Sequence, residues 1–163
     1  MNLHEYQAKE ILSGFGVRIQ RGYVASSAEE AVEEAKKLRN ETGTDFFVIK
    51  AQVHAGGRGK GGGVKLAKSI DEVFSISDEI IGMNLVTPQT SMEGKKVYQV
   101  LIAEDVYYPG ASEVEEYYIS VLLNRSSAKN MIMYSTEGGM DIETVAEKTP
   151  HLIHTLDICP KDG

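Results

Sequence analysis

Along the first sixteen residues, apolar residues recur at roughly the spacing that places side chains on one face of an α-helix. In the segment NLHEYQAKEILSGFG they are Leu3, Tyr6, Ile11 and Leu12. Asn2 is a candidate cap at the amino end, and Gly14 or Gly16 is a candidate terminator. The pattern predicts an amphipathic helix over residues 2–16.

Two further helices are marked at their amino ends by a serine with a glutamate three positions later. This spacing is a capping box, in which each side chain satisfies a free backbone N–H group of the first helical turn. Ser27 and Glu30 open the segment SSAEEAVEEAKKLRNETG, and Ser69 and Glu72 open a second segment that runs to about Ile81. Both segments are therefore predicted to be helical.

Runs that are rich in β-branched and aromatic residues, or that alternate between apolar and polar residues, predict six strands. They are RIQRGYVA (18–25), DFFVIKA (45–51), GVKLA (63–67), KVYQVLIAED (96–105), EEYYISVLLNRS (115–126) and KNMIMYSTEGG (129–139). A last short helix is expected at DIETVAEKT, before Pro150. Because helices and strands do not alternate strictly, the predicted fold class is α+β.

Composition and net charge limit the kinds of molecule that this protein is expected to bind. The 163 residues carry a formal net charge of −7, and such a surface repels the phosphates of nucleic acid. No apolar run approaches the ~20 residues of a membrane span, and the amino end lacks the basic and apolar segments of a secretory signal. Cys159 is the single cysteine, which fits a reducing compartment. We therefore expect a cytoplasmic protein, without nucleic-acid or membrane partners, that binds any anion locally.

One segment departs from the acidic balance. Residues 48–69 hold five cationic side chains, six glycines and no carboxylate. A Walker A loop is excluded because Lys60 is followed by glycine and a predicted strand, where that motif has Ser or Thr and a helix. Gly57, Gly59 and Gly62 match the spacing of a dinucleotide-binding fingerprint, but the helix which that motif requires is missing.

A third interpretation is a hairpin tip that closes over a polyphosphate. Glycines let backbone N–H groups approach phosphate oxygens, and Arg58 and Lys60 add positive charge. Lys50 ends a predicted buried strand, where an unpaired ammonium would be costly and would need an anion such as phosphate. The alternative is a flexible basic surface turn.

Carboxylates follow in the second half of the chain. Glu104 ends the strand YQVLIAE, and Glu116 opens the strand EEYYISV. Either carboxylate could accept hydrogen bonds from ribose hydroxyls or an exocyclic amine, and either could also be an ordinary acid at a strand end. The four histidines show no metal-ligand spacing, so no zinc site is predicted.

Five segments together resemble a known family. MNLHEYQAKEIL, VIKAQVHAGGRGKGGGVK, LLNRSS, STEGGMDIE and VAEKTPHLIH are similar, in this order, to the amino-terminal part of the β subunits of succinate–CoA ligases, also called succinyl-CoA synthetases. The resemblance extends from residue 1 to about residue 158. Malate–CoA ligases and the related portion of ATP-citrate lyase share much of it, so the acid substrate stays open.

The resemblance implies an ATP-grasp fold, in which two α+β lobes hold a nucleotide. Residues 21–102 would form the smaller lobe, and residues 1–20 and 103–163 the first part of a larger lobe that is truncated at its carboxy-terminal side. Lys50 corresponds to the family lysine that contacts the nucleotide phosphates. Gly57, Arg58 and Gly59 correspond to the loop that covers these phosphates.

The same resemblance implies contacts for the rest of the nucleotide. Glu104 corresponds to an acid at the hinge beside the base, Tyr107 to a nearby backbone contact, and Glu116 to an acid further on. Gln20 is a candidate contact to the base. The stretch YYPGASEV departs from the shorter family pattern as an insertion between the two acids.

The implied activity is that of an acid–thiol ligase, which interconverts succinyl-CoA, phosphate and a nucleoside diphosphate with succinate, CoA and a nucleoside triphosphate. ATP and ADP are the expected nucleotides, with GTP and GDP as an alternative. The phosphorylated histidine belongs to the partner α subunit, and the Mg²⁺ ligands are expected beyond residue 163. This fragment is therefore expected to hold no catalytic residue and no metal ligand, and to be inactive alone.

Three alternatives stay open at this point. The first is the β subunit of a malate–CoA ligase. The second is a nucleotide-binding module without catalysis. The third is a carboxylate–amine ligase on the same fold.

Overall fold

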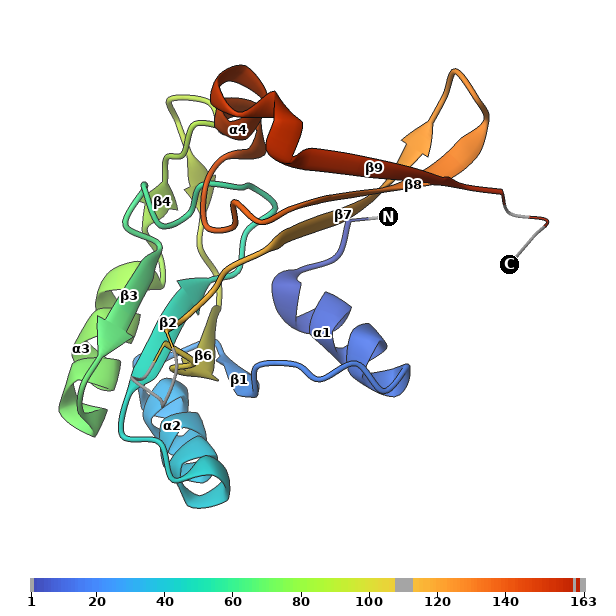
Figure 1. The fold of residues 1–163 in the computed structure, drawn as a ribbon. Helices are drawn as coiled ribbons and strands as arrows, with labels where there is room; N and C mark the ends of the chain where they lie inside the picture. Colours follow the sequence, from blue (N-terminus) through green and yellow to red (C-terminus); the bar gives the residue numbers. More distant parts are fainter. Residues whose placement is uncertain (1, 108–112, 160, 162–163) are drawn as a thin grey trace. The chain divides into compact units, whose positions relative to one another are not determined.

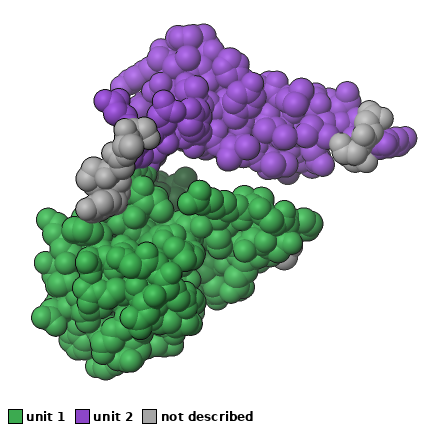
Figure 2. Space-filling view, turned by 60° about the horizontal axis from the view of Figure 1, so that its bottom comes forward, with its two compact units in different colours: residues 1–108 green, residues 109–163 purple. Residues whose placement is uncertain are grey.

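The structure is a computed structural model that describes residues 2–107, 113–159 and 161. The chain divides into two compact units, residues 1–108 and residues 109–163 (Figure 2). Helices and antiparallel strands occur in both units, so the predicted α+β class is confirmed (Figure 1). No helix in the described part of the chain combines the length and apolar character that a bilayer crossing needs.

Unit 1 is built on a four-stranded antiparallel sheet (Figure 1). In spatial order its strands are β1 (Gly22–Ala25), β6 (Val100–Glu104), β2 (Phe47–Ala51) and β3 (Val64–Ala67). β2 and β3 form the predicted hairpin, with Lys50 opposite Val64. The hairpin therefore holds the glycine-rich segment as its connecting loop.

Three helices belong to this unit, and two of them begin where the sequence predicts. They are α1 (Glu5–Gly14), α2 (Ala28–Thr42) and α3 (Ile70–Ile80). The Ser27 hydroxyl accepts a hydrogen bond from the Glu30 N–H at 3.1 Å, and the Ser69 hydroxyl accepts one from Glu72 at 3.2 Å. Both predicted caps are thus confirmed, and α2 and α3 pack on the sheet.

The cap predicted for α1 is wrong. Helix α1 begins after His4, whose extended backbone is held because its N–H donates to Gln7 Oε1 at 2.9 Å. His4, and not Asn2, is therefore the residue at the cap position of this helix. At the other end the chain turns at Gly16, which has a φ of +76°, so Gly16 and not Gly14 is the terminating glycine.

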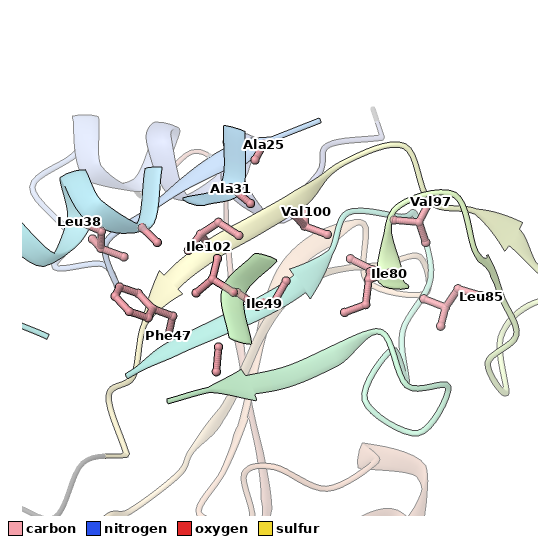
Figure 3. Close-up of a cluster of buried hydrophobic side chains, with 14 residues drawn as sticks. Ala25, Ala31, Leu38, Phe47, Ile49, Ile80, Leu85, Val97, Val100 and Ile102 are labelled. Carbon is pink, nitrogen blue, oxygen red and sulfur yellow. The ribbon is translucent and has the colours of Figure 1, made fainter. Parts of the chain in front are cut away.

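The core of unit 1 lies between the sheet and α2 and α3 (Figure 3). On β2, Phe47, Ile49 and Ala51 are fully buried, while Val48 and Lys50 are only partly buried. Because successive side chains of a strand point to opposite faces, the burial of the first three residues turns Lys50 to the other face of the sheet. Helix α1 supplies the partner of Lys50 on that face.

Unit 2 is a three-stranded antiparallel sheet with a short helix. Its elements are β7 (Tyr118–Asn124), β8 (Lys129–Ser135), α4 (Ile142–Lys148), a 3₁₀ helix (Pro150–Leu152) and β9 (Ile153–Ile158). Of its described residues only Ser135 and Val145 are buried. The described part of this unit therefore has little buried apolar core, and β8 pairs with β7 on one side and with β9 on the other.

Several predicted boundaries need correction. The strands expected over 18–25 and 96–105 are confined to β1 and β6, which are shorter. β9 was missed, because His, Thr and Asp interrupt its apolar pattern and its partner β8 supplies the order. The short pair β4 (Asn84–Leu85) and β5 (Lys95–Lys96) was also missed. Most of the stretch YYPGASEV lies outside the described residues, and the lobe boundaries at 20/21 and 102/103 stay a prediction.

Gly22 allows β1 to lie close to β6. A Cβ atom added there would lie 2.6 Å from the Ile102 carbonyl oxygen, whereas one added at Gly14 would meet nothing within 4 Å. We expect Gly22→Ala to lower the free energy of unfolding by about 1–3 kcal/mol. Gly14→Ala, the matched control at the end of a helix, should leave it unchanged or raise it by up to about 1 kcal/mol. Urea denaturation measures both, and equal effects would contradict the close approach.

Candidate functional site

The glycine-rich loop joins β2 to β3 through a series of tight turns. The Lys60 N–H donates to the Gly57 carbonyl at 3.1 Å, and the Gly63 N–H donates to the Arg58 carbonyl at 2.8 Å. Gly57 has a φ of +70°, a conformation that glycine adopts without strain. Because the loop leads into β3 and not into a helix, the exclusion of the Walker A and dinucleotide motifs is confirmed.

The Glu5 carboxylate is bound by cations of this segment and of α1. Lys50 Nζ donates to Glu5 Oε1 at 3.3 Å, and Arg58 Nη2 donates to Glu5 Oε2 at 2.6 Å. Lys9 Nζ lies 3.1 Å from Glu5 Oε1. Lys50 therefore has an anionic partner, as expected for a partly buried ammonium, and within the chain this partner is the Glu5 carboxylate. The contact of Lys50 with a nucleotide phosphate stays a prediction.

Both cations have a second, neutral acceptor. Lys50 Nζ donates to Gln20 Oε1 at 2.9 Å, and Arg58 Nη1 donates to the Ala51 carbonyl at 2.7 Å. These side chains are each about one fifth exposed. Each cation is thus held by one carboxylate oxygen and by one uncharged group.

The local charges fix the protonation of this cluster. Burial raises the pKa of Glu5, but the charges of Lys50 and Lys9 and the hydrogen bond from Arg58 outweigh it and bring the pKa down to about 2. Burial lowers the pKa of Lys50 against the attraction of Glu5. With Lys9, Lys50 and Arg58 around one carboxylate, the cluster keeps an excess of positive charge that can attract an anion.

Glu104 ends β6, as predicted, and its carboxylate faces Arg21. The Arg21 N–H donates to Glu104 Oε1 at 2.9 Å, and Arg21 Nη2 donates to Glu104 Oε2 at 3.3 Å. Two surface hollows of about 370 and 480 Å³ adjoin Glu104 and Asp105. The carboxylate is therefore oriented by Arg21 beside space on the surface.

Gln20 connects Glu104 to the cation cluster. Its Nε2 donates to the Glu104 carbonyl at 2.5 Å, while its Oε1 accepts from Lys50 and from Lys9. The structure thus brings three of the predicted site positions, Lys50, Arg58 and Glu104, into one hydrogen-bonded network within unit 1.

The remaining predicted residues lie outside this network. The Tyr107 N–H donates to Asp105 Oδ1 at 2.9 Å, and the tyrosine side chain is half exposed. Glu116 belongs to unit 2, two residues before β7, and its carbonyl accepts from the Gly138 N–H at 3.1 Å. The nucleotide contacts expected of Tyr107 and Glu116 stay predictions, as do those expected of Lys50, Gly57, Arg58, Gly59 and Glu104.

Sequence reasoning missed Glu5 altogether. The acid is 45 positions from Lys50 and 53 from Arg58, so no local spacing connects them. The available signal was charge balance, because an island of five cations without a carboxylate needs acids from elsewhere in the chain. Reasoning also missed that the rings of His4 and His54 stack at 4.0 Å. Among the described residues no group of three or more His, Cys, Asp or Glu side chains could hold a metal ion.

Comparison with known proteins identifies close relatives. Residues 2–163 match the ATP-grasp domain family. The β subunits of ADP-forming succinate–CoA ligases from Christiangramia forsetii and Flavobacterium psychrophilum are 74% and 70% identical over all 163 residues. These residues make up 41% of each relative, so the chain spans about two fifths of the length of the relatives it matches.

Two solved structures share the fold. A dinucleotide-forming acetyl-coenzyme A synthetase from Ca. Korarchaeum cryptofilum superimposes with a TM-score of 0.55 and 26% identity, over 82% of this chain and 51% of that one. A D-alanine–D-alanine ligase from Coxiella burnetii gives a TM-score of 0.52 over 99% of this chain and 45% of that one. The identity of 13% in the second case shows the fold alone. The fold implied by the sequence resemblance is confirmed.

The depressed pKa of Glu5 makes one contribution to stability depend on pH. The carboxylate favours the folded chain above its ordinary pKa of 4.5, and this contribution is lost as the pH falls toward about 2. We expect Glu5→Gln to cost on the order of 3 kcal/mol of unfolding free energy near neutral pH. The difference between wild type and variant should shrink between pH 4.5 and 2. Urea titrations across this range measure it, and a difference that does not change with pH would contradict the ion cluster.

Proposed function

We propose, from the premise that this chain belongs to the ATP-grasp domain family, that it is the nucleotide-binding part of a succinate–CoA ligase β subunit. The observation that carries the proposal is 74% identity over the whole chain to a β subunit of that name. Two further such subunits, at 70% and 68% identity, point the same way.

The proposed reaction converts succinyl-CoA, phosphate and ADP into succinate, CoA and ATP, and also runs in reverse. The phosphoryl group would pass through a histidine of the α subunit, so no histidine of this chain has that role. In this scheme the chain binds and orients the nucleotide. A related precedent is the acetyl-coenzyme A synthetase above, whose structure contains a phosphorylated phosphohistidine segment.

The geometry supports different binding roles for the two ends of the network in unit 1, with phosphate contacts at one end and base or ribose contacts at the other. Lys50 and Arg58 offer charge and N–H donors to the phosphates, and such charge-assisted contacts are the strong ones. The backbone of Gly57 and Gly59 would approach the same phosphates. Glu104, oriented by Arg21, would accept hydrogen bonds from the base or the ribose. The resemblance assigns further nucleotide contacts to Tyr107 and to Glu116.

Other components of the proposed enzyme lie outside this chain. We place the α subunit as partner, mainly through the part of the β subunit that follows residue 163. Mg²⁺ would accompany the nucleotide, and among the described residues no group of three or more His, Cys, Asp or Glu side chains could hold it. A cytoplasmic location follows from the proposed activity and fits the single cysteine.

Lys50→Met tests the phosphate end of the site. The change keeps most of the volume of the side chain and removes its charge, so the affinity for magnesium ADP should fall about ten- to hundredfold. Arg58→Ala should cost less, because a loop contributes only while it is closed. Calorimetric titration of the 163-residue chain measures the affinity, and amide NMR follows Lys50, residues 57–59 and Glu104. Equal ADP affinities of Lys50→Met and wild type would remove Lys50 from the site.

A chimera tests the whole activity. The chain replaces the matching two fifths of the Christiangramia forsetii β subunit, to which it is 74% identical, and the product is combined with the α subunit of that organism. We expect the chimera to form succinyl-CoA from succinate, CoA and ATP, and the Lys50→Met chimera to lose most of this activity. Malate is offered in parallel. Activity with neither acid would overturn the proposed function, and GTP in place of ATP reports the base preference.

A further inference from the structure

The two side chains proposed to bind phosphate already hold an anion from the same chain. We infer that the Glu5 carboxylate is an internal stand-in for a nucleotide phosphate, which occupies Lys50 and Arg58 in the empty site and competes with the incoming phosphate for them. This inference rests on the proposed function, because it assigns phosphates to the same two cations. It adds Glu5 as a residue that sets the affinity of the site.

The geometry of the carboxylate supports competition. One Glu5 oxygen accepts from Lys50 Nζ at 3.3 Å and the other from Arg58 Nη2 at 2.6 Å, so the carboxylate bridges the two cations as a phosphate would. A phosphate that reaches both cations must take these donors or approach beside a carboxylate that keeps them. In the second case the negative charges of the phosphate and of the Glu5 carboxylate would lie close together and repel each other.

A positioning role for Glu5 is the competing explanation, and the second acceptors argue against it. Lys50 stays bound to Gln20 Oε1 without Glu5, and its backbone is fixed by the pairing of β2 with β3 and β6. Arg58 stays bound to the Ala51 carbonyl. Removal of the Glu5 charge would therefore free N–H donors of Lys50 and Arg58, while both side chains keep their positions.

Removal of the Glu5 charge should have opposite effects on the stability of the protein without phosphate and on its affinity for phosphate. Without Glu5 three cations are left together on one face, which destabilises the empty protein. A bound phosphate then meets no neighbouring carboxylate. Removing this like charge should therefore raise the affinity for phosphate, by about five- to tenfold when the charges are partly screened by solvent.

The test uses tripolyphosphate and magnesium ADP as probes on the 163-residue chain. Glu5→Gln should bind tripolyphosphate about five- to tenfold more tightly than wild type by calorimetry, although its unliganded melting temperature is lower. Glu5→Asp keeps the charge and should stay within about twofold of wild type. Glu10→Gln makes the same chemical change at an exposed position of α1 and should change neither value.

The outcomes separate this inference from the proposed function. Equal or weaker tripolyphosphate binding by Glu5→Gln, or no binding by either protein, overturns the competition, and weaker binding indicates positioning. A third outcome separates the two proposals. If Lys50→Met binds ADP more weakly than wild type, but Glu5→Gln binds tripolyphosphate no more tightly, the proposed function stands and the inference is wrong. Tighter binding of tripolyphosphate by Glu5→Gln supports the inference. If the same chain shows no preference for ADP over tripolyphosphate, that result counts against the nucleotide site.

A measurement on wild type covers the case in which Glu5→Gln does not fold. The carboxyl carbon of Glu5 is followed by NMR at pH 7 as tripolyphosphate is added, with Glu10 as the internal control. Displacement from Lys50 and Arg58 should shift the Glu5 signal and leave the Glu10 signal in place. Binding with an unchanged Glu5 signal would overturn the inference.

Discussion

The alternation of side chains along β2 is the constraint on which the rest of unit 1 depends. Phe47, Ile49 and Ala51 must face the helices because their burial builds the core, and this leaves Lys50 on the opposite face. A shift of the strand by one residue would bury the ammonium and expose the core side chains. The packing that stabilises the sheet therefore also decides where the positive charge lies.

Charge balance is the second requirement, and it is met across long stretches of sequence. The segment 48–69 contains no acid, and three of its cations have carboxylate partners on helices. Glu5 of α1 binds Lys50 and Arg58, and Glu79 of α3 binds Lys65. Helix α1 thus contributes more than apolar contact. Its first residue neutralises part of the face that the proposed nucleotide would occupy.

Local features of this fold could be predicted from the sequence, and features that depend on distant pairing could not. Ser27 and Ser69 marked their helices because a cap involves residues three positions apart. Strand β9 was missed because its own pattern is weak and β8 supplies its hydrogen bonds. For the site, the family resemblance pointed to Lys50, Arg58, Glu104 and Gln20. The contact of Glu5 with the cations, and the hydrogen bonds of the Gln20 amide to Lys50 and to the Glu104 carbonyl, depend on pairing between distant parts of the chain and became visible only in the fold.

That amide has a mechanical consequence. The oxygen of Gln20 is bound to Lys50 and the nitrogen to the Glu104 carbonyl, and the two atoms belong to one rigid, planar group. A movement of the ammonium toward a new partner must therefore rotate the amide or break one of its bonds. A rearrangement at Lys50 would therefore change either its own hydrogen bond to Gln20 or the one that Gln20 donates to the Glu104 carbonyl.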